Sequence, residues 1–289
     1  MGFDAQSEYR GAAAVNPMVS AVYAGCARID CVSSDNRGLN YGDGVFETMR
    51  VDRGGLPLWP RHLARLGEGA QRLGIALPER AFIEARLHEI CAGVDAGVIK
   101  LLLTRGDGGR GYAPSVDAPP VWVLSLHPLP PKQTALQLHA CNTRLATQPL
   151  LAGIKHCNRL EQVLARTEAQ RAGCDEGLMR DMAGNAVCAT AANLLAYCDG
   201  RWLTPPIEHC GVAGVLRGWL LEQGMLEVAE LSMDALAAAD ALTLCNAVRG
   251  ILPVARLGAR SWRAQPAVAA LQTALAKDYP MYSNTVELA

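Results

Sequence analysis

Apolar positions recur along the chain at two different spacings, and each spacing predicts a different element. Within PRHLARLGEGAQRLG (60–74), apolar residues that include Leu66 and Ala70 follow one another at helical intervals. This pattern predicts an amphipathic helix with one buried stripe. Pro60 suits the first helical turn and Gly74 suits the position after the last one, so we expect the helix to span the segment between them.

Other segments favour strands. Continuous apolar runs of strand length occupy 98–105 and 121–127. A turn at MAGN separates two β-prone stretches within 176–197, which predicts a β-hairpin followed by a further strand. A further helix is expected over 158–173, with Asn158 as its N-cap and a glycine as its stop.

Helices and strands are mixed along the chain without regular βαβ alternation, which predicts an α+β fold. The segment HPLPPKQ (127–133) carries three prolines in five residues and is typical of a semi-rigid linker. We therefore expect a mobile tail at 1–18, an N-terminal α+β subdomain at 19–127, a linker at 128–134 and a C-terminal subdomain at 135–289.

Composition narrows the class of protein. The 289 residues are 50% hydrophobic and 19% charged with a formal net charge of −1, as in an ordinary soluble globular protein. Neither a basic patch nor an apolar run of membrane-spanning length occurs, so no nucleic-acid or membrane partner is expected. The ten cysteines are scattered without a C-x-x-C pair, which predicts reduced thiols in the cytoplasm, with no disulfide framework and no metal site.

A glycine-rich segment, TRGDGGRGY (104–112), matches the spacing G-x-G-x-x-G. A dinucleotide-binding loop would need a helix to begin there, but prolines at 114, 119 and 120 prevent one. Two readings are left: a flexible loop between strands, or a loop that presents Arg110 and Tyr112 to a small anionic ligand.

Lysine is rare, since only four lysines occur among the 27 lysines and arginines. One of them, Lys155, stands between an apolar run and a predicted helix. A lysine can lose its proton and attack a carbonyl group, whereas an arginine effectively cannot. Taken alone, Lys155 fits either a solvated strand end or a Schiff-base lysine. Arg65 likewise fits either a solvated helix face or a phosphate clamp.

Several windows in order resemble a known family: RGLNYGDGVFETMRV, RHLARL, TRGDGGRGY, LAGIKHCNRLEQVL, AANLL, GVLR and CNAVRGILPV. Together they are similar to the fold-type IV pyridoxal-phosphate (PLP) enzymes, the class IV aminotransferase-like group with a two-subdomain D-amino-acid aminotransferase-like architecture. The windows RGDGGRGY and LAGIKHCNRLEQV are most similar to the 4-amino-4-deoxychorismate lyase branch of that family. The resemblance covers nearly the whole chain after about residue 20.

The resemblance implies a role for each matching residue. Lys155 would hold the cofactor PLP as a Schiff base and act as the general base. Arg65 would bind the cofactor phosphate, helped by backbone amides at a helix start and at a turn. Other residues would line the substrate side. The cofactor-binding set is then Lys155, Arg65, Cys188, Val215, Leu216, Asn246 and Ala247, and the substrate-binding set is Tyr41, Arg110 and Tyr112.

One position departs from the family pattern. Family members carry a glutamate five residues before the asparagine of the AANLL window, where it keeps the pyridine nitrogen of the cofactor protonated. Here that asparagine is Asn193, and Cys188 stands five residues before it. A thiol has a reference pKa near ~8.5 and offers little negative charge. The resemblance therefore implies a weaker electron sink than in an aminotransferase.

The expected function is a PLP-dependent lyase that converts 4-amino-4-deoxychorismate to 4-aminobenzoate and pyruvate in folate biosynthesis. One alternative is a D- or branched-chain amino-acid aminotransferase of the same fold. A second is a non-catalytic PLP-binding paralogue, because the usual glutamate is Cys188. The resemblance also implies a homodimer, and Thr48, Tyr112 and Lys155 are candidates to protonate the leaving pyruvate.

Overall fold

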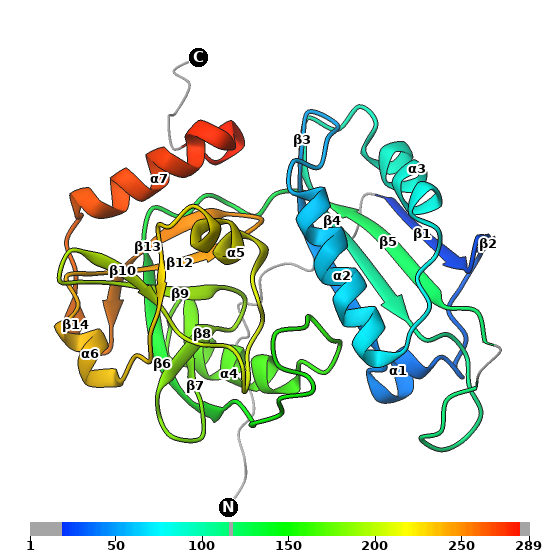
Figure 1. Ribbon diagram of the computed structural model, residues 1–289, viewed down its shortest axis with the longest axis horizontal. Coiled ribbons are helices and arrows are strands. Elements are labelled where there is room, and N and C mark those ends of the chain that lie inside the picture. The colour runs from blue at the N-terminus through cyan, green and yellow to red at the C-terminus, as the bar shows by residue number, and fades with distance from the viewer. Residues whose placement is uncertain (1–18, 116–117, 284–289) are drawn as a thin grey trace, which may run out of the picture.

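A computed structural model describes residues 19–115 and 118–283 and shows two lobes lying side by side (Figure 1). The N-terminal lobe takes its strands from residues 19–127 and the C-terminal lobe from residues 136–261. Residues 128–135, which join the lobes, contain neither helix nor strand. The tail expected at 1–18 lies outside the described residues.

The N-terminal lobe is built on an antiparallel sheet with the strand order β2-β1-β5-β4-β3. Strand β3 forms one edge, and its inward positions alternate with half-exposed ones, as a sheet with one covered face requires. Glu47 occupies one of those inward positions among apolar neighbours such as Val45 and Met49. The strands are β1 (Val19–Ala24), β2 (Ala27–Ile29), β3 (Gly44–Asp52), β4 (Ala96–Thr104) and β5 (Val121–His127).

Two helices, α2 (Trp59–Leu73) and α3 (Arg80–Cys91), cover the inner face of this sheet. The helix predicted between Pro60 and Gly74 is confirmed as α2, whose chain leaves the helix at Gly74 in a left-handed conformation with φ of 63°. Helix α2 packs on β3 and also meets the C-terminal lobe, so it lies at the junction of the two lobes (Figure 1).

The C-terminal lobe contains a nine-stranded mixed sheet, in the order β11-β10-β9-β12-β13-β6-β7-β8 with β14 beside β13. Strand β8 also pairs with β9, so the path from β9 round to β8 closes on itself. The hairpin predicted around MAGN is confirmed as β7 and β8. The strands are β6 (Leu136–Arg144), β7 (Glu176–Arg180), β8 (Ala186–Ala189), β9 (Asn193–Cys198), β10 (Arg201–Thr204), β11 (Glu227–Val228), β12 (Ala241–Asn246), β13 (Gly250–Leu257) and β14 (Arg260–Ser261).

The helices of this lobe pack around the closed strand path. The helix expected after residue 158 is present as α4, but it begins at Leu160, and the predicted N-cap Asn158 is wrong. The Asn158 amide instead donates a hydrogen bond to the Gly42 carbonyl across the lobe junction. No helix of the described residues is long and apolar enough to cross a membrane. The helices are α4 (Leu160–Arg171), α5 (Val215–Glu222), α6 (Met233–Ala238), α7 (Pro266–Asp278) and the 3-10 helix η1 (Pro280–Tyr282).

One short helix of the N-terminal lobe was not predicted. Helix α1 (Arg37–Tyr41) begins where the Asn36 side chain accepts a hydrogen bond from the Gly38 amide. The glycine-rich segment 104–112, as expected, starts no helix.

Candidate active site

The backbone around Lys155 is fastened to the edge strand of the other lobe. The Phe46 amide donates a 2.9 Å hydrogen bond to the Lys155 carbonyl, and the Cys157 amide donates one of 2.8 Å to the Gly44 carbonyl. The free edge of β3 is thereby paired by a segment of the C-terminal lobe. The Lys155 side chain is directed into a cavity, with its Nζ 4.3 Å from the centre of the Phe46 ring.

The environment of Lys155 favours the uncharged amine. Burial lowers its pKa to about 7, the positive charge of Arg65 adds to the shift, and the negative charge of Glu47 opposes it. A protonated lysine is poorly stabilised where water is excluded, which is the usual way an enzyme obtains a nucleophilic or basic amine at neutral pH.

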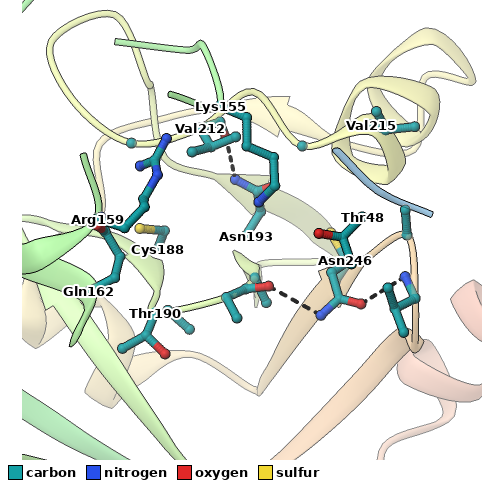
Figure 2. A pocket seen from close by; sticks show the side chains of 18 of the residues that line it. Thr48, Lys155, Arg159, Gln162, Cys188, Thr190, Asn193, Val212, Val215 and Asn246 are labelled. Atoms are coloured by element: carbon teal, nitrogen blue, oxygen red, sulfur yellow. Dashed lines mark hydrogen bonds between the residues drawn. The ribbon is translucent and has the colours of Figure 1, made fainter. Parts of the chain in front are cut away.

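The cavity has a volume of about 360 Å³ and lies between the two lobes. Its wall combines Arg65 from the middle of α2, the edge strand β3, the turn between β8 and β9, the start of α5 and the turn after β12. Figure 2 shows Lys155 together with wall residues from several of these segments, among them Thr48, Val215 and Asn246. Six of the seven predicted cofactor-binding residues line the cavity: Lys155, Arg65, Cys188, Val215, Asn246 and Ala247. The seventh, Leu216, follows Val215 in the chain, and its side chain is fully buried.

Arg65 is held rigidly by a buried carboxylate. Its Nε lies 2.8 Å from Glu47 Oε1, its Nη2 donates to Glu47 Oε2, and its Nη1 donates a 2.9 Å bond to the Ala213 carbonyl. His62 Nδ1 lies 2.6 Å from the same carboxylate. Burial alone would raise the pKa of Glu47, but Arg65 and His62 outweigh it and bring that pKa to about 2.

The Glu47–His62 pair was not found from the sequence. The signal was present, because the alternation of β3 puts a carboxylate on the apolar face between Val45 and Met49. A charge at an inward strand position requires a buried partner.

The start of helix α5 offers hydrogen-bond donors to the cavity. Its N-cap Gly214 makes no side-chain cap, so the first-turn amides that begin at Val215 lack an intrahelical partner. A Cβ at Gly214 would lie 1.8 Å from Asn193 Oδ1, so no side chain fits there. Glycine thus leaves the helix N-terminus open to an anion.

Asn246 shapes the neighbouring turn. Its Oδ1 accepts bonds from the amides of Val248 and Arg249, at 3.0 and 2.8 Å, and its Nδ2 donates to the Ala191 carbonyl at 3.2 Å. These bonds occupy the side chain in holding the turn after β12. Any contact of this turn with a ligand phosphate is therefore expected from its backbone, at Ala247, rather than from the Asn246 amide.

Cys188 lies in β8, opposite Asn193 on β9, and is 7% exposed. Burial raises the pKa of its thiol to about 12, with Cys210 adding to the rise and Arg159 opposing it. The thiol is therefore neutral at physiological pH. No Asp or Glu occurs among the described residues that line the cavity, although Arg65, Lys155 and Arg159 do. Its wall is suited to an anionic ligand.

Arg159 is a wall residue that the sequence analysis did not single out. Figure 2 shows its guanidinium on the same side of the cavity as Cys188. Its family window was recognised, but nothing in the spacing indicated whether an arginine at the start of a helix would point into a cavity or into solvent.

The predicted substrate residues lie elsewhere on this chain. Tyr41 and Tyr112 pack against each other with ring centres 5.6 Å apart, and Tyr112 is 85% exposed. Arg110 is also exposed, and none of the three lines the Lys155 cavity of the same chain. Buried Arg37 holds their loop, since it pairs with Asp43 and donates a 2.8 Å bond to the Tyr112 carbonyl.

Comparison with known proteins agrees with this geometry. The family model described as amino-transferase class IV matches residues 44–257. The aminodeoxychorismate lyase of Vibrio harveyi is 35% identical over 235 residues, which cover 78% of this chain and 86% of that protein. A putative branched-chain-amino-acid aminotransferase of Methanocaldococcus jannaschii is 30% identical over 240 residues, or 79% of this chain and 83% of that protein.

Among solved structures, 4-amino-4-deoxychorismate lyase from Pseudomonas aeruginosa is similar along nearly its whole length. It superposes with a TM-score of 0.84 at 44% identity, covering 90% of this chain and 99% of that one. The Pseudomonas structure and the Vibrio relative carry the same activity in their names. Each is more similar in sequence to this chain than the Methanocaldococcus aminotransferase is.

Proposed function

The chain belongs to the class IV aminotransferase family, and from this membership we propose that it is a PLP-dependent aminodeoxychorismate lyase. It converts 4-amino-4-deoxychorismate to 4-aminobenzoate and pyruvate. The observation that carries the proposal is Lys155, whose pKa is lowered to about 7 and which lies on the wall of the cavity. Arginine side chains also line this cavity, and none of the described residues that line it is an Asp or Glu.

The residues present fit PLP. Lys155 would hold its aldehyde carbon, while the open N-terminus of α5 and the backbone at Ala247 would receive its phosphate, with Arg65 beside them. A dianionic phosphate suits this end because the first-turn amides of α5 have no intrahelical partner and can donate hydrogen bonds to it. Arg65, which Glu47 and the Ala213 carbonyl hold in place, lies beside them. The space that Gly214 leaves beside Asn193 keeps the helix end accessible.

When bound, PLP withdraws electrons and so stabilises the charge left on a carbon next to the amine it holds. Once the amine of the substrate had taken the place of Lys155 on the cofactor, the freed Lys155 Nζ would remove the proton from the amine-bearing carbon of the substrate. The C–H electron pair forms a ring double bond as the carbon–oxygen bond to the enolpyruvyl group breaks. The product ring is aromatic, which helps drive the departure.

The departing enolpyruvate must gain a proton to become pyruvate. Of the three candidates, Thr48 and Lys155 line the cavity and Tyr112 does not. Thr48 lies opposite Cys188 across the space in Figure 2, and we assign the Thr48 hydroxyl to this proton delivery.

Cys188 is assigned to the ring-nitrogen end of the cofactor. Because the thiol is neutral, it does not hold a proton on that nitrogen as a carboxylate would. A lyase that forms an aromatic product tolerates the weaker electron sink, whereas transamination depends on a strong one. This argument favours the lyase over an aminotransferase, although an aminotransferase relative at 30% identity makes transamination the second candidate.

The protein is further proposed to act in the cytoplasm as a homodimer. Its ten cysteines are all free thiols, as expected in a reducing compartment. Tyr41 of α1 and the loop with Arg110 and Tyr112 do not line the cavity of their own chain, so we assign them to the substrate side of the partner's cavity.

A coupled assay tests the function directly. Purified protein with PLP and aminodeoxychorismate should release pyruvate and 4-aminobenzoate in equal amounts. Release of a keto acid from an amino acid, without 4-aminobenzoate, would instead identify an aminotransferase.

A further inference from the structure

The Arg159 side chain donates hydrogen bonds to the backbone on both sides of Lys155. Its Nε donates a 2.9 Å bond to the His156 carbonyl, and its Nη2 donates a 3.1 Å bond to the Ile154 carbonyl. These two residues flank Lys155 in the chain. The guanidinium is therefore held at a fixed place on the cavity wall, on the side where Cys188 lies (Figure 2).

The charge of Arg159 is not balanced by the protein. None of the ion pairs among the described residues includes Arg159, whereas Arg65 on the same wall is paired with Glu47. Its two hydrogen-bond partners are neutral carbonyls. A half-buried cation without an anionic partner is costly unless a ligand supplies the anion.

The neighbouring thiol does not supply that anion. Burial holds the Cys188 thiol in its neutral form, and Cys210 nearby strengthens the effect. A carboxylate at position 188 would face Arg159 and cancel its charge. With Cys188 in its place, this end of the cavity has a net positive charge.

We propose that Arg159 sets the charge state of the PLP ring: it holds the ring's 3-oxygen deprotonated and keeps the ring nitrogen free of a proton. The inference rests on the proposed use of PLP by this chain. Arg159 acts here as a positioning residue for charge, and Lys155 remains the group that moves the proton.

The direction follows from electrostatics. A fixed cation near an ionisable group favours the form with fewer protons, typically by about one to three pKa units at close range. Both ring groups of PLP therefore lose their protons at lower pH when Arg159 is present. A ring without a proton on its nitrogen is a weaker electron sink, which agrees with lyase chemistry and disfavours transamination.

The test compares three variants by absorption spectroscopy. Arg159→Gln removes the positive charge, and Arg159→Lys keeps it. The control is Arg171→Gln, which removes a positive charge from the exposed last turn of α4, the helix that follows Arg159. Each protein is loaded with PLP, and the band of lysine-bound PLP, at roughly 410–430 nm, is followed between about pH 5 and pH 10, where such groups titrate. The melting temperature and the dissociation constant of PLP from the apo-protein are measured alongside.

We expect Arg159→Gln to raise the pH midpoint of the spectral change by about one unit or more. The midpoint should stay at the wild-type value in Arg159→Lys and Arg171→Gln. An unchanged midpoint in a folded Arg159→Gln protein would overturn the inference. If Arg159→Gln does not fold, Arg159→Lys decides. A midpoint that shifts by about one unit or more, although the charge is kept, contradicts the inference, and a wild-type midpoint supports it.

Failure of the inference can be told apart from failure of the proposed function. A wild-type protein that forms no borohydride-sensitive band would reject both. A wild-type band whose midpoint does not depend on Arg159 would reject only the inference about Arg159.

Discussion

Arg65 and Glu47 form a two-pronged ion pair at the wall of the Lys155 cavity, with Nε 2.8 Å from Oε1 and Nη2 bonded to Oε2. Glu47 is fully buried, so the cation that faces the proposed phosphate position is oriented by a core carboxylate rather than by solvent. Both members of the pair act on the pKa of Lys155: Arg65 lowers it, and Glu47, on strand β3 of the N-terminal lobe, raises it.

The first prediction concerns this pair. Glu47→Gln leaves Arg65 without its buried anion, so the free energy of unfolding should fall by about 3–5 kcal/mol. Loss of the Glu47 charge should also lower the pKa of Lys155 further below about 7, because Glu47 now raises it. Denaturant unfolding and pH-dependent lysine labelling measure the two effects. Glu68→Gln, in the exposed i,i+4 pair with Arg72, is the matched control and should change neither.

The second prediction concerns the lysine itself. Lys155→Ala should lower the lyase rate by roughly a thousandfold or more, since one side chain serves as anchor and base. It should also abolish the PLP absorption band that borohydride removes. Lys100→Ala is a matched control, because its Nζ also lies near the Phe46 ring, at 5.2 Å, but it does not line the cavity. Full activity of Lys155→Ala would contradict the site.

The third prediction is a pH dependence. Burial lowers the pKa of Lys155 to about 7, so the free amine is the minor form below that pH and the major form above it. The rate at which apo-protein captures PLP should rise about tenfold per pH unit below pH 7 and level off above it. Stopped-flow absorbance measures the rate. A rise that continues to about pH 10, the reference lysine value, would show that burial does not shift this amine.

The fourth prediction uses Cys188. Cys188→Glu places a carboxylate at the ring-nitrogen end and should speed the conversion of bound PLP to pyridoxamine phosphate by an amino acid, by roughly tenfold or more. Cys188→Ser is the control, because it is neutral and close in size. Equal rates in the wild type and both variants would show that residue 188 does not act on the cofactor. Conversion in the wild type as fast as lyase turnover would remove the argument against transamination.

The fifth prediction tests the assignment of the 104–112 loop to the partner cavity. Lys155→Ala and Arg110→Ala should each be inactive or impaired alone. After the two are unfolded together and refolded, mixed dimers contain one intact cavity each, and about a quarter of wild-type activity should return for a two-fold dimer. No recovery, although mixed dimers have formed, would contradict the assignment of Arg110 to the partner's cavity.

The order of several windows along the chain, rather than any one of them, predicted which residues would come together. Lys155, Arg65, Cys188 and the start of α5 belong to short windows whose backbone form follows from their own residues, and the structure brings them to one cavity. Gly74 ended helix α2 as expected, in the left-handed conformation that glycine adopts readily.

What could not be predicted was decided by long-range competition for hydrogen bonds. Asn158 is a good N-cap by type, but the Gly42 carbonyl, more than a hundred residues away in sequence, accepts its amide instead. The same holds for Glu47, whose partners on α2 are found only after the sheet and helix have packed. Arg159 turns to two carbonyls of its own segment, a choice that spacing alone does not indicate.

The hydrogen bonds between β3 and the segment around Lys155 join the two lobes, so the reactivity of the Lys155 amine depends on whether the lobes are packed together. The lysine belongs to one lobe, but the other lobe contributes the Phe46 ring that its Nζ contacts and the charge of Arg65 that helps to lower its pKa. If the lobes parted, water would reach the amine and its pKa would return toward the reference value of about 10.4. A chain with its lobes apart would therefore retain every site residue and still present an ordinary protonated lysine.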